Sequence, residues 1–226
     1  MPFPVTVISP DIFALRPDFK ALSIVAEGLS NAASAPAASA ALAAACAKPC
    51  DAAWAEAHRE AWRAAYRAFG AKPQRTLPSS EALLKRVQRD GALPPVNAIV
   101  DLYNAVSLRY ALPVGGEDAA TYVGAPRLIR AVGTERFDTT QNGVAQTETP
   151  EPGEVVWCDD LGVTCRRWNW RQGTRTRIET STTRAWFILE ALGPMPEADL
   201  LRAGEELANG LRSFSPNAAI SSRLIS

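Results

Sequence analysis

Arginine and tryptophan are concentrated in one stretch of the chain, RRWNWRQGTRTRIETSTTR (166–184). It holds six arginines and a single acid, Glu179, although the 226-residue chain has a formal net charge of zero. Arginine beside tryptophan is suited to holding phosphates and to stacking on bases. A surface β-hairpin with one basic face has the same composition. The stretch therefore indicates either a nucleic-acid contact or an ordinary hairpin.

Strand geometry would divide the start of this stretch between two faces, because successive side chains of a strand point to opposite sides. One face would be an aromatic surface with one cation, formed by Arg166, Trp168 and Trp170. The other would offer donors for a ribose, phosphate or α-carbonyl oxygen, from Arg167, Asn169 and Arg171. Alternatively, one tryptophan lies in the core and the arginines pair with acids of a neighbouring strand, Glu154, Asp159 and Asp160.

Other chemistry-bearing patterns are scarce. His58 is the only histidine and lies in a helical pattern, so the residues do not indicate a Ser-His-Asp or Cys-His arrangement. Of the four cysteines, Cys46 and Cys50 lie in an alanine-rich helical stretch and Cys158 and Cys165 in apparent strands, which does not favour a zinc site. The Gly pair in PVGGED (113–118) matches neither a P-loop nor a dinucleotide motif. We therefore expect no metal and no cofactor, and an enzyme that positions a substrate or water with polar side chains and backbone donors.

Charge is balanced overall but unevenly distributed. Residues 135–160 carry seven acids and one base, whereas 166–184 carry the opposite excess. A balanced chain argues against a general basic coat for nucleic acid, so any such contact must be local. Apolar residues make up 47% of the chain, which is ordinary for a folded protein.

The elements that would position these residues form three groups along the chain. Runs 3–9 and 19–29 have strand patterns, and 38–69, 77–91 and 94–110 have helical ones. Several short β-rich runs follow, and a last helix is expected over 197–211. These β-rich runs are 126–132, 136–140, 153–160, 163–171 and 174–180. The run 185–192 is ambiguous between strand and helix, and 140–154 is expected to be a polar loop or a long hairpin turn.

This order predicts an α+β fold and a single domain over 1–226. In the helix predicted over 94–110, the apolar residues form one stripe, and Asn97, Asp101, Asn104 and Ser107 fall elsewhere on the wheel. A hydrogen-bonding role within the helix is favoured over catalysis for Asp101 and Asn104. The helix over 77–91 has a serine as candidate N-cap and ends at Gly91.

The stretch RVQRDGALPPVNAIVDLYNAVSLRYALPVGGED (86–118) resembles the B3/B4 domain of the bacterial phenylalanyl-tRNA synthetase β-subunit. The matching positions are Gly91, Pro95, Asn97, Val100, Asp101, Asn104, Pro113 and Asp118. EVVWCDDLG and TRAWFILEALGP resemble later strands of that domain, and the resemblance is strongest over 70–195. DLYNAVSLRYALPVGG and CRRWNWRQGTRT are more similar still to stand-alone B3/B4 proteins.

The resemblance implies an α+β fold with mixed β-sheets and flanking helices, and a partnership with tRNA or aminoacyl-tRNA. In the synthetase the domain removes a wrongly attached amino acid, chiefly tyrosine, from the 3′ end of the tRNA. A stand-alone copy would act in trans as an aminoacyl-tRNA deacylase. The alternatives are a non-catalytic tRNA- or RNA-binding module and a small-molecule binder on the same fold. A shared fold does not by itself distinguish these three functions.

Two departures bear on the site. The family's histidine falls on Gly115, followed by Glu117 at a hydrophobic position, and the loop with the tyrosine-reading glutamate has no clear counterpart. A different amino acid, or another carbonyl-bearing substrate, is therefore expected, and the catalytic residue is left unassigned. The two glycines allow close backbone approach and can donate N–H groups to an oxygen. The expected substrate-binding residues are Asn97, Asp101, Asn104, Gly115, Gly116, Arg167, Trp168, Asn169 and Arg171.

The sequence also suggests where the protein works. The N-terminal residues lack the pattern of a signal peptide, and the apolar stretch 32–47 is short and interrupted by Pro36. We therefore expect a cytoplasmic protein with reduced thiols and no membrane segment. The oligomeric state and the amino acid or tRNA involved are left open.

Overall fold

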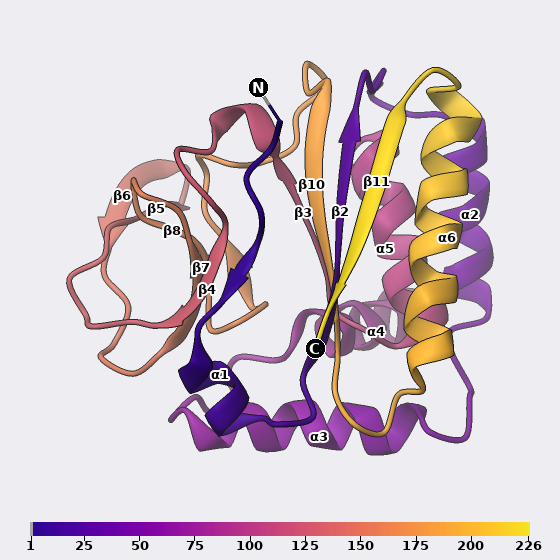
Figure 1. Cartoon of the computed structure of the whole chain (residues 1–226). Helices are drawn as coiled ribbons and strands as arrows, with labels where there is room; N and C mark the ends of the chain where they lie inside the picture. The colour runs from indigo at the N-terminus through magenta and orange to yellow at the C-terminus, as the bar shows by residue number, and fades with distance from the viewer. Residues whose placement is uncertain (1) are drawn as a thin grey trace.

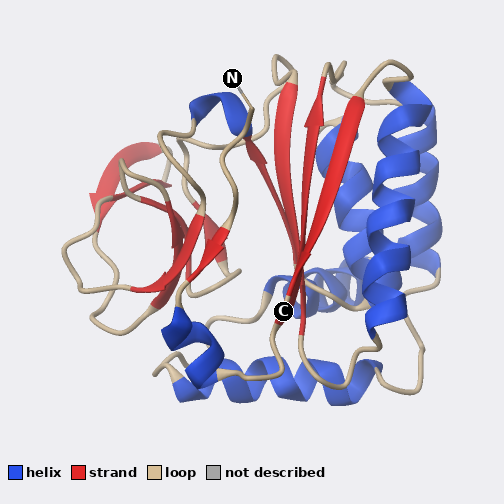
Figure 2. Cartoon of the chain, viewed as in Figure 1, coloured by secondary structure: helices blue, strands red, loops and turns tan. Residues whose placement is uncertain are grey.

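Two β-sheets packed side by side, with helices outside one and beneath both, form the molecule (Figures 1 and 2). The computed structural model describes residues 2–226. The larger sheet has the order β1-β4-β7-β8-β5-β6, with β9 paired to β8. The other has four strands in the order β11-β2-β10-β3. This α+β architecture with mixed sheets confirms the fold class expected from the sequence.

The seven-stranded sheet is built from short strands. Their bounds are Val7–Ile8 (β1), Arg127–Arg130 (β4), Phe137–Gln141 (β5), Val144–Glu148 (β6), Val155–Cys158 (β7), Val163–Arg166 (β8) and Arg171–Gln172 (β9). β1 pairs with β4, and β5 with β8, in parallel, whereas the remaining pairs are antiparallel.

The four-stranded sheet is antiparallel throughout and contains the longer strands. These are Lys20–Glu27 (β2), Val114–Asp118 (β3), Arg184–Ala191 (β10) and Ala219–Ile225 (β11). Alternate side chains of β10 enter different cores. Trp186 and Ile188 face the seven-stranded sheet, whereas Phe187 and Leu189 face the helices. β10 thus contributes side chains to the cores on both sides of its sheet.

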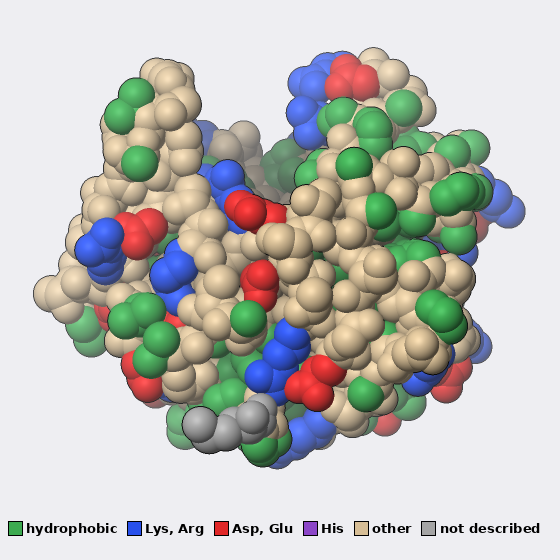
Figure 3. Space-filling view, turned by 90° about the horizontal axis from the view of Figure 1, so that it is seen from above, with side chains coloured by type: hydrophobic (Ala, Val, Ile, Leu, Met, Phe, Trp, Pro, Cys, Tyr) green, Lys and Arg blue, Asp and Glu red, His purple; other side chains and the backbone are tan. Residues whose placement is uncertain are grey.

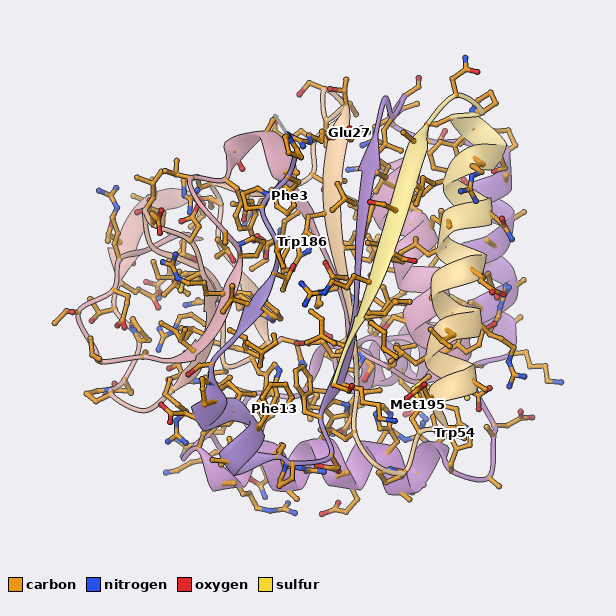
Figure 4. The ribbon with its side chains drawn as sticks, viewed as in Figure 1. Phe3, Phe13, Glu27, Trp54, Trp186 and Met195 are labelled. Atoms are coloured by element: carbon orange, nitrogen blue, oxygen red, sulfur yellow. The ribbon has the colours of Figure 1, made fainter. Side chains whose placement is uncertain are left out.

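Six α-helices accompany the sheets. Their bounds are Pro10–Leu15 (α1), Pro36–Ala47 (α2), Ala55–Ala68 (α3), Ser79–Asp90 (α4), Ala98–Tyr110 (α5) and Glu197–Phe214 (α6), with a 3-10 turn at Ala119–Thr121 (η1). α2, α5 and α6 cover the outer face of the four-stranded sheet, and α3 runs beneath both sheets (Figure 1). The ring of Phe3 lies 6.4 Å from that of Trp186, in the space between the sheets (Figure 4).

The structure corrects several expectations for individual elements. The helical pattern of 38–69 divides into α2 and α3, separated by residues 48–54, which include Pro49. The cap of α4 is Pro78 and not a serine, and no side chain caps that helix end. The ambiguous run 185–192 is the strand β10, while β3 and β11 were not predicted. The polar region 140–154 contains a hairpin whose second strand is β6.

The segment 174–180 is not the strand that its β-rich composition suggests. It crosses from β9 in one sheet to β10 in the other, and its polar groups are bound on the way. Arg175 donates to both oxygens of Asp159 at 2.7 and 2.9 Å, and Thr176 O accepts from Asp118 N at 2.9 Å. These contacts satisfy the backbone and side chains of a crossing segment without a ladder.

Candidate functional site

A cavity of about 260 Å³ opens at the edge strand β3, and we call it the central pocket. It is bounded by residues of α4 and α5, by β3 and β10, and by residues of β7 and β8 in the other sheet. Tyr103, Trp157, Trp168 and Trp170 supply aromatic walls. None of the lining residues is a lysine, an arginine or a histidine, and two are glutamates. The lining of the pocket therefore combines aromatic side chains with two carboxyl groups and contains no cation.

The backbone of β3 offers a hydrogen-bond donor at this edge. Asp118 N donates outward to Thr176 O at 2.9 Å, whereas Glu190 N on β10 donates to Pro113 O on the inner side. Because backbone groups alternate sides along a strand, the N–H and C=O of Gly116 also point outward. Gln172 confirms this orientation, since its Nε2 donates to Gly116 O at 3.0 Å. The Gly116 N–H is therefore directed to the open edge where the pocket lies.

Glycine is required at this point of β3. A Cβ atom on Gly116 would stand 2.8 Å from Tyr103 Cε1 and 3.0 Å from Phe187 Cδ1. These distances are shorter than carbon atoms tolerate, so the absence of a side chain lets the Tyr103 ring lie against the strand. On the other face, a Cβ on Gly115 would stand 3.2 Å from Ile188 Cγ2. The paired glycines thus bring an aromatic wall of the pocket close to the backbone donor.

Glu190 is a carboxyl group in the core between the sheets, and it borders the pocket. Its Oε1 accepts from Trp157 Nε1 at 3.1 Å and from Trp168 Nε1 at 3.0 Å, and its Oε2 accepts from Asn169 Nδ2 at 3.0 Å. Among residues 2–226, no cation pairs with it. Burial raises the pKa of Glu190 to about 8, although the three donors act in the opposite direction. At neutral pH this side chain is therefore mostly protonated.

Glu117 is the second acid of the pocket, on β3. It is 4% exposed, and its Oε2 accepts a hydrogen bond of 2.5 Å from the hydroxyl of Tyr122. Burial raises the pKa of Glu117 to about 7, against the lowering effect of hydrogen bonds from its hydroxyl neighbours. Glu117 pairs in register with Trp186, and Glu190 lies four residues further along β10. The two carboxyl groups thus lie on the same face of the sheet, separated along the strand direction by about 13 Å.

The alternation expected for residues 166–171 is wrong. β8 ends at Arg166, and a turn follows in which Arg167 and Trp168 have φ angles of +48° and +66°. Trp168 N donates to Val155 O at 2.6 Å, which directs the indole into the core, where it is fully buried. Two non-glycine residues in the left-handed region are uncommon and indicate a backbone fixed by its surroundings.

The arginines of the stretch follow the alternative interpretation. Arg166 is buried and forms a two-pronged pair with Glu154, at 2.9 and 2.7 Å, and a third bond to Glu148. Arg175 pairs with Asp159, as above, while Asp160 pairs with Arg127 instead. Charges of both signs are interspersed over the face of the molecule seen from above (Figure 3). The arginine count thus does not translate into a continuous basic surface there.

The expected site residues converge only in part. Five of them line the central pocket: Asn104, Gly115, Gly116, Trp168 and Asn169. Among the residues described, the Asn104 side chain makes no hydrogen bond, so it is available to a ligand. Asn169 is more committed, because its Oδ1 accepts from Tyr66 Oη at 2.8 Å and its Nδ2 donates to Glu190. The role of these five in binding stays a prediction.

The other four expected residues do not line the central pocket. Asn97 caps α5 by accepting from Val100 N at 3.0 Å. Asp101 is fully buried, with Oδ1 accepting from Val96 N at 2.8 Å, and burial raises its pKa. Arg171 bonds to Glu148 and lies over the ring of Trp170. Arg167 lines a different cavity. Asn97 and Asp101 thus have hydrogen-bonding roles around α5, which agrees with the role favoured for Asp101.

Sequence reasoning missed the two glutamates of the pocket. Glu190 is the single acid of the apolar strand RAWFILEA, and Glu117 follows two glycines in VGGED; an acid inside an apolar run was the available signal for Glu190. His58 lies outside the pocket and is fully buried, between Trp62 Nε1, Leu192 N and Ala111 O. Burial lowers the pKa of His58 to about 4, so it is neutral and enclosed near neutral pH.

Residues 61–198, more than half of the chain, match the model of the B3/4 domain. The chain belongs to the B3/4 domain family. Comparison with curated protein sequences gives no match. Among solved structures, the chain is similar to an N-terminal fragment of the phenylalanyl-tRNA synthetase β-subunit from Pyrococcus horikoshii, with a TM-score of 0.53 and 9% identity. That likeness covers 98% of this chain and 54% of the fragment, and it shows a shared fold.

Residues 2–226 of this B3/4 domain protein hold neither of two further features. No three His, Cys, Asp or Glu side chains there are grouped so that they could hold a metal ion. No helix in the same part of the chain is long and apolar enough to cross a bilayer.

Proposed function

We propose that this B3/4 domain protein hydrolyses the ester bond of a mischarged aminoacyl-tRNA in trans, with the aminoacyl group in the central pocket. The observation that carries the proposal is the pocket itself, which combines aromatic walls, a backbone donor at Gly116 and two buried carboxyl groups. Its volume of about 260 Å³ lies just below the usual range for ligand pockets, about 300–1,000 Å³. A single amino-acid residue is a suitable occupant, and the family fold supports a link to tRNA.

The charge pattern favours an esterified amino acid over a free one. A free amino acid carries a carboxylate, and burying a carboxylate without a cation or several donors is costly. The lining contains no cation and two acids, Glu117 and Glu190. In the ester the carboxyl charge is absent, while the α-ammonium group remains and is compatible with a lining that holds no cation. Because hydrolysis creates a carboxylate that the pocket does not stabilise, the free amino acid would then leave.

The proposed chemistry uses water as the nucleophile. A water oxygen bonds to the ester carbonyl carbon, and the bond from that carbon to the ribose oxygen breaks. The Gly116 N–H would donate to the carbonyl oxygen as negative charge develops there. Glu117 is the candidate base for the water proton, because burial brings its pKa to about 7, close to the pH at which a base is most effective. The proton then passes to the departing ribose oxygen, which balances the reaction.

A panel of mischarged tRNAs tests the proposal. The fraction of amino acid still attached would be followed over time with and without the protein. We expect one class of aminoacyl-tRNA to lose its ester faster, and Glu117→Gln to abolish that gain while the ligand still binds. Glu205→Gln is the matched control, since Glu205 is exposed and away from the pocket. Binding without turnover on every tRNA would instead identify a non-catalytic tRNA-binding module.

A further inference from the structure

A second cavity, of about 270 Å³, lies beside the turn at 167–170, and we call it the basic pocket. Three cationic side chains line it: Lys72 and Arg75 from the loop after α3, and Arg167 from the turn. Phe69, at the end of α3, also lines it. The acids at its border are Glu151 and Glu154. Whether the cavity attracts an anion depends on how these charges are already paired.

One of the two acids is neutralised by an arginine outside the cavity, whereas two of the cations have no ion pair within residues 2–226. Glu154 is 4% exposed and is held by both prongs of Arg166 behind the cavity. Lys72 and Arg75 are exposed, and within residues 2–226 neither has a carboxylate in ion-pair range. Glu151 is an exposed acid at the rim. With Arg166 cancelling Glu154, the pocket retains an excess of positive charge.

Arg167 has one distant counter-ion within residues 2–226, Glu154, which also accepts from its backbone N at 3.0 Å. Its guanidinium stacks over the ring of Trp170 at 4.5 Å, and its Nε is 3.9 Å from Glu154 Oε2, which is beyond hydrogen-bond range. Burial lowers the pKa of Arg167, and the charges of Arg166 and Arg171 act in the same direction. The left-handed backbone at φ +48° adds a local cost. An anion beside Arg167 would relieve this crowding of positive charge.

We propose that the basic pocket binds a phosphate group of an RNA strand. The ligand chemistry follows from the convergence of two free cations and one stacked guanidinium, since arginine and lysine together are suited to phosphate oxygens. The location connects it with the central pocket, because one turn supplies Arg167 to the basic pocket and Trp168, Asn169 and Trp170 to the other. The proposal rests on the proposed function: one RNA end would place its phosphate here and its aminoacyl group in the central pocket.

The salt dependence of binding to uncharged RNA tests this directly. A fluorescein-labelled single-stranded RNA of about 12 nucleotides would be titrated with the protein at several salt concentrations, and its anisotropy recorded. The variants are Lys72→Ala/Arg75→Ala and Arg167→Gln. The matched control, Lys48→Ala/Arg223→Ala, removes two exposed cations that have no ion pair within residues 2–226 and lie outside both pockets. The thermal midpoint of every variant would be measured first, to establish that it is folded.

We expect the Lys72/Arg75 variant to bind RNA about tenfold more weakly at low salt. Its slope of log affinity against log salt should fall by about 0.7 for each phosphate that the variant no longer neutralises. Arg167→Gln should act in the same direction, and the control should match the wild type. Equal slopes for all four proteins would overturn the proposal. So would binding of inorganic phosphate or pyrophosphate that requires Lys72 and Arg75 but leaves the RNA bound, because that result identifies a small-anion site.

The outcome is separable from that of the proposed function, because the probe carries no aminoacyl ester. Normal deacylation with unchanged salt slopes would rule out the RNA-phosphate role of the basic pocket and leave the hydrolase. Altered salt slopes without deacylation of any substrate would leave an RNA-phosphate site on a protein that does not edit.

Discussion

Replacing Glu190 by glutamine should change how the stability of the protein depends on pH. Burial raises the pKa of this carboxyl group to about 8, compared with an ordinary value of 4.5. Between these values the folded state holds a proton that the unfolded state has released, so stability falls as pH rises through this range. From pH 6.5 to 8 the loss due to Glu190 alone is about 1.5 kcal/mol, at about 1.4 kcal/mol per full pH unit.

Within the window from pH 6.5 to 8, Glu190 makes the largest contribution to the change in stability, and two other buried groups make smaller ones. Lowering of the His58 pKa from 6.5 to about 4 has the opposite effect, since the unfolded state takes up the proton; this effect fades above pH 6.5 and returns only about 0.4 kcal/mol within the window. Glu117, with a pKa of about 7, adds a smaller loss, under about 1 kcal/mol in the window. The wild type should therefore lose about 2 kcal/mol in total.

Glutamine at 190 keeps the volume but cannot serve all three donors. Its oxygen can accept from Trp157 and Trp168, and its amide then meets Asn169 Nδ2, so two donors face each other. Leaving one buried donor unpaired costs about 1–3 kcal/mol. We expect the variant to be less stable by this amount at pH 6.5 and the difference to shrink by about 1.5 kcal/mol at pH 8, because only the wild type loses a proton there.

Urea unfolding followed by tryptophan fluorescence measures this difference at each pH. Glu205→Gln is the control and should match the wild type throughout, because Glu205 is exposed. A stability difference between wild type and Glu190→Gln that stays constant from pH 6.5 to 8 would contradict the raised pKa. It would mean that Glu190 is ionised in the folded protein and that its three donors outweigh its burial.

Three other predictions concern the same architecture. Gly116→Ala should destabilise the protein by about 1–3 kcal/mol in urea unfolding, because the added Cβ would stand 2.8 Å from Tyr103 Cε1; an unchanged midpoint would show that the ring can move freely. An amino-acid amide should bind at least about tenfold more tightly than the free amino acid with the same side chain in calorimetry, and equal affinities would contradict the exclusion of carboxylates from the central pocket. We also propose that residues 1–226 form one folding unit, so fluorescence and circular dichroism should give one coincident unfolding transition, and two separated transitions would divide it.

The sequence predicted the fold class, because helical and strand periodicity are strong in the long elements. α5, α6 and β2 are found where their patterns indicated. The prediction of individual elements was wrong where tertiary contacts, and not the local sequence pattern, determine the structure. Residues 174–180 look like a strand, and ion pairing of Arg175 with Asp159 holds them as a crossing segment instead. β3 was not predicted, because a pair of glycines is typical of a loop. Only the packing of Tyr103 against the strand shows why glycine is needed at Gly116.

The sequence predicted five of the residues that line the central pocket, and its four other expected site residues do not line it. Asn104 and Gly116 meet there because α5 leads directly into β3. Arg167 was grouped with Asn169 on the basis of strand alternation, and the left-handed turn sends the two side chains to different cavities. The acids Glu117 and Glu190 could not be assigned to one pocket from the sequence, because only the register of β10 against β3 places them on the same face of the sheet.

Multiple turnover of mischarged tRNA decides whether the protein is the hydrolase proposed. The protein would be mixed with an excess of about tenfold of each labelled aminoacyl-tRNA near neutral pH, and the free amino acid released would be counted. We predict several equivalents of amino acid per protein from one class of substrate, with release reduced to the uncatalysed rate by Glu117→Gln and unchanged by Glu205→Gln. Release that never exceeds the uncatalysed rate, or that is equal for Glu117→Gln and the wild type, would contradict the proposed hydrolysis.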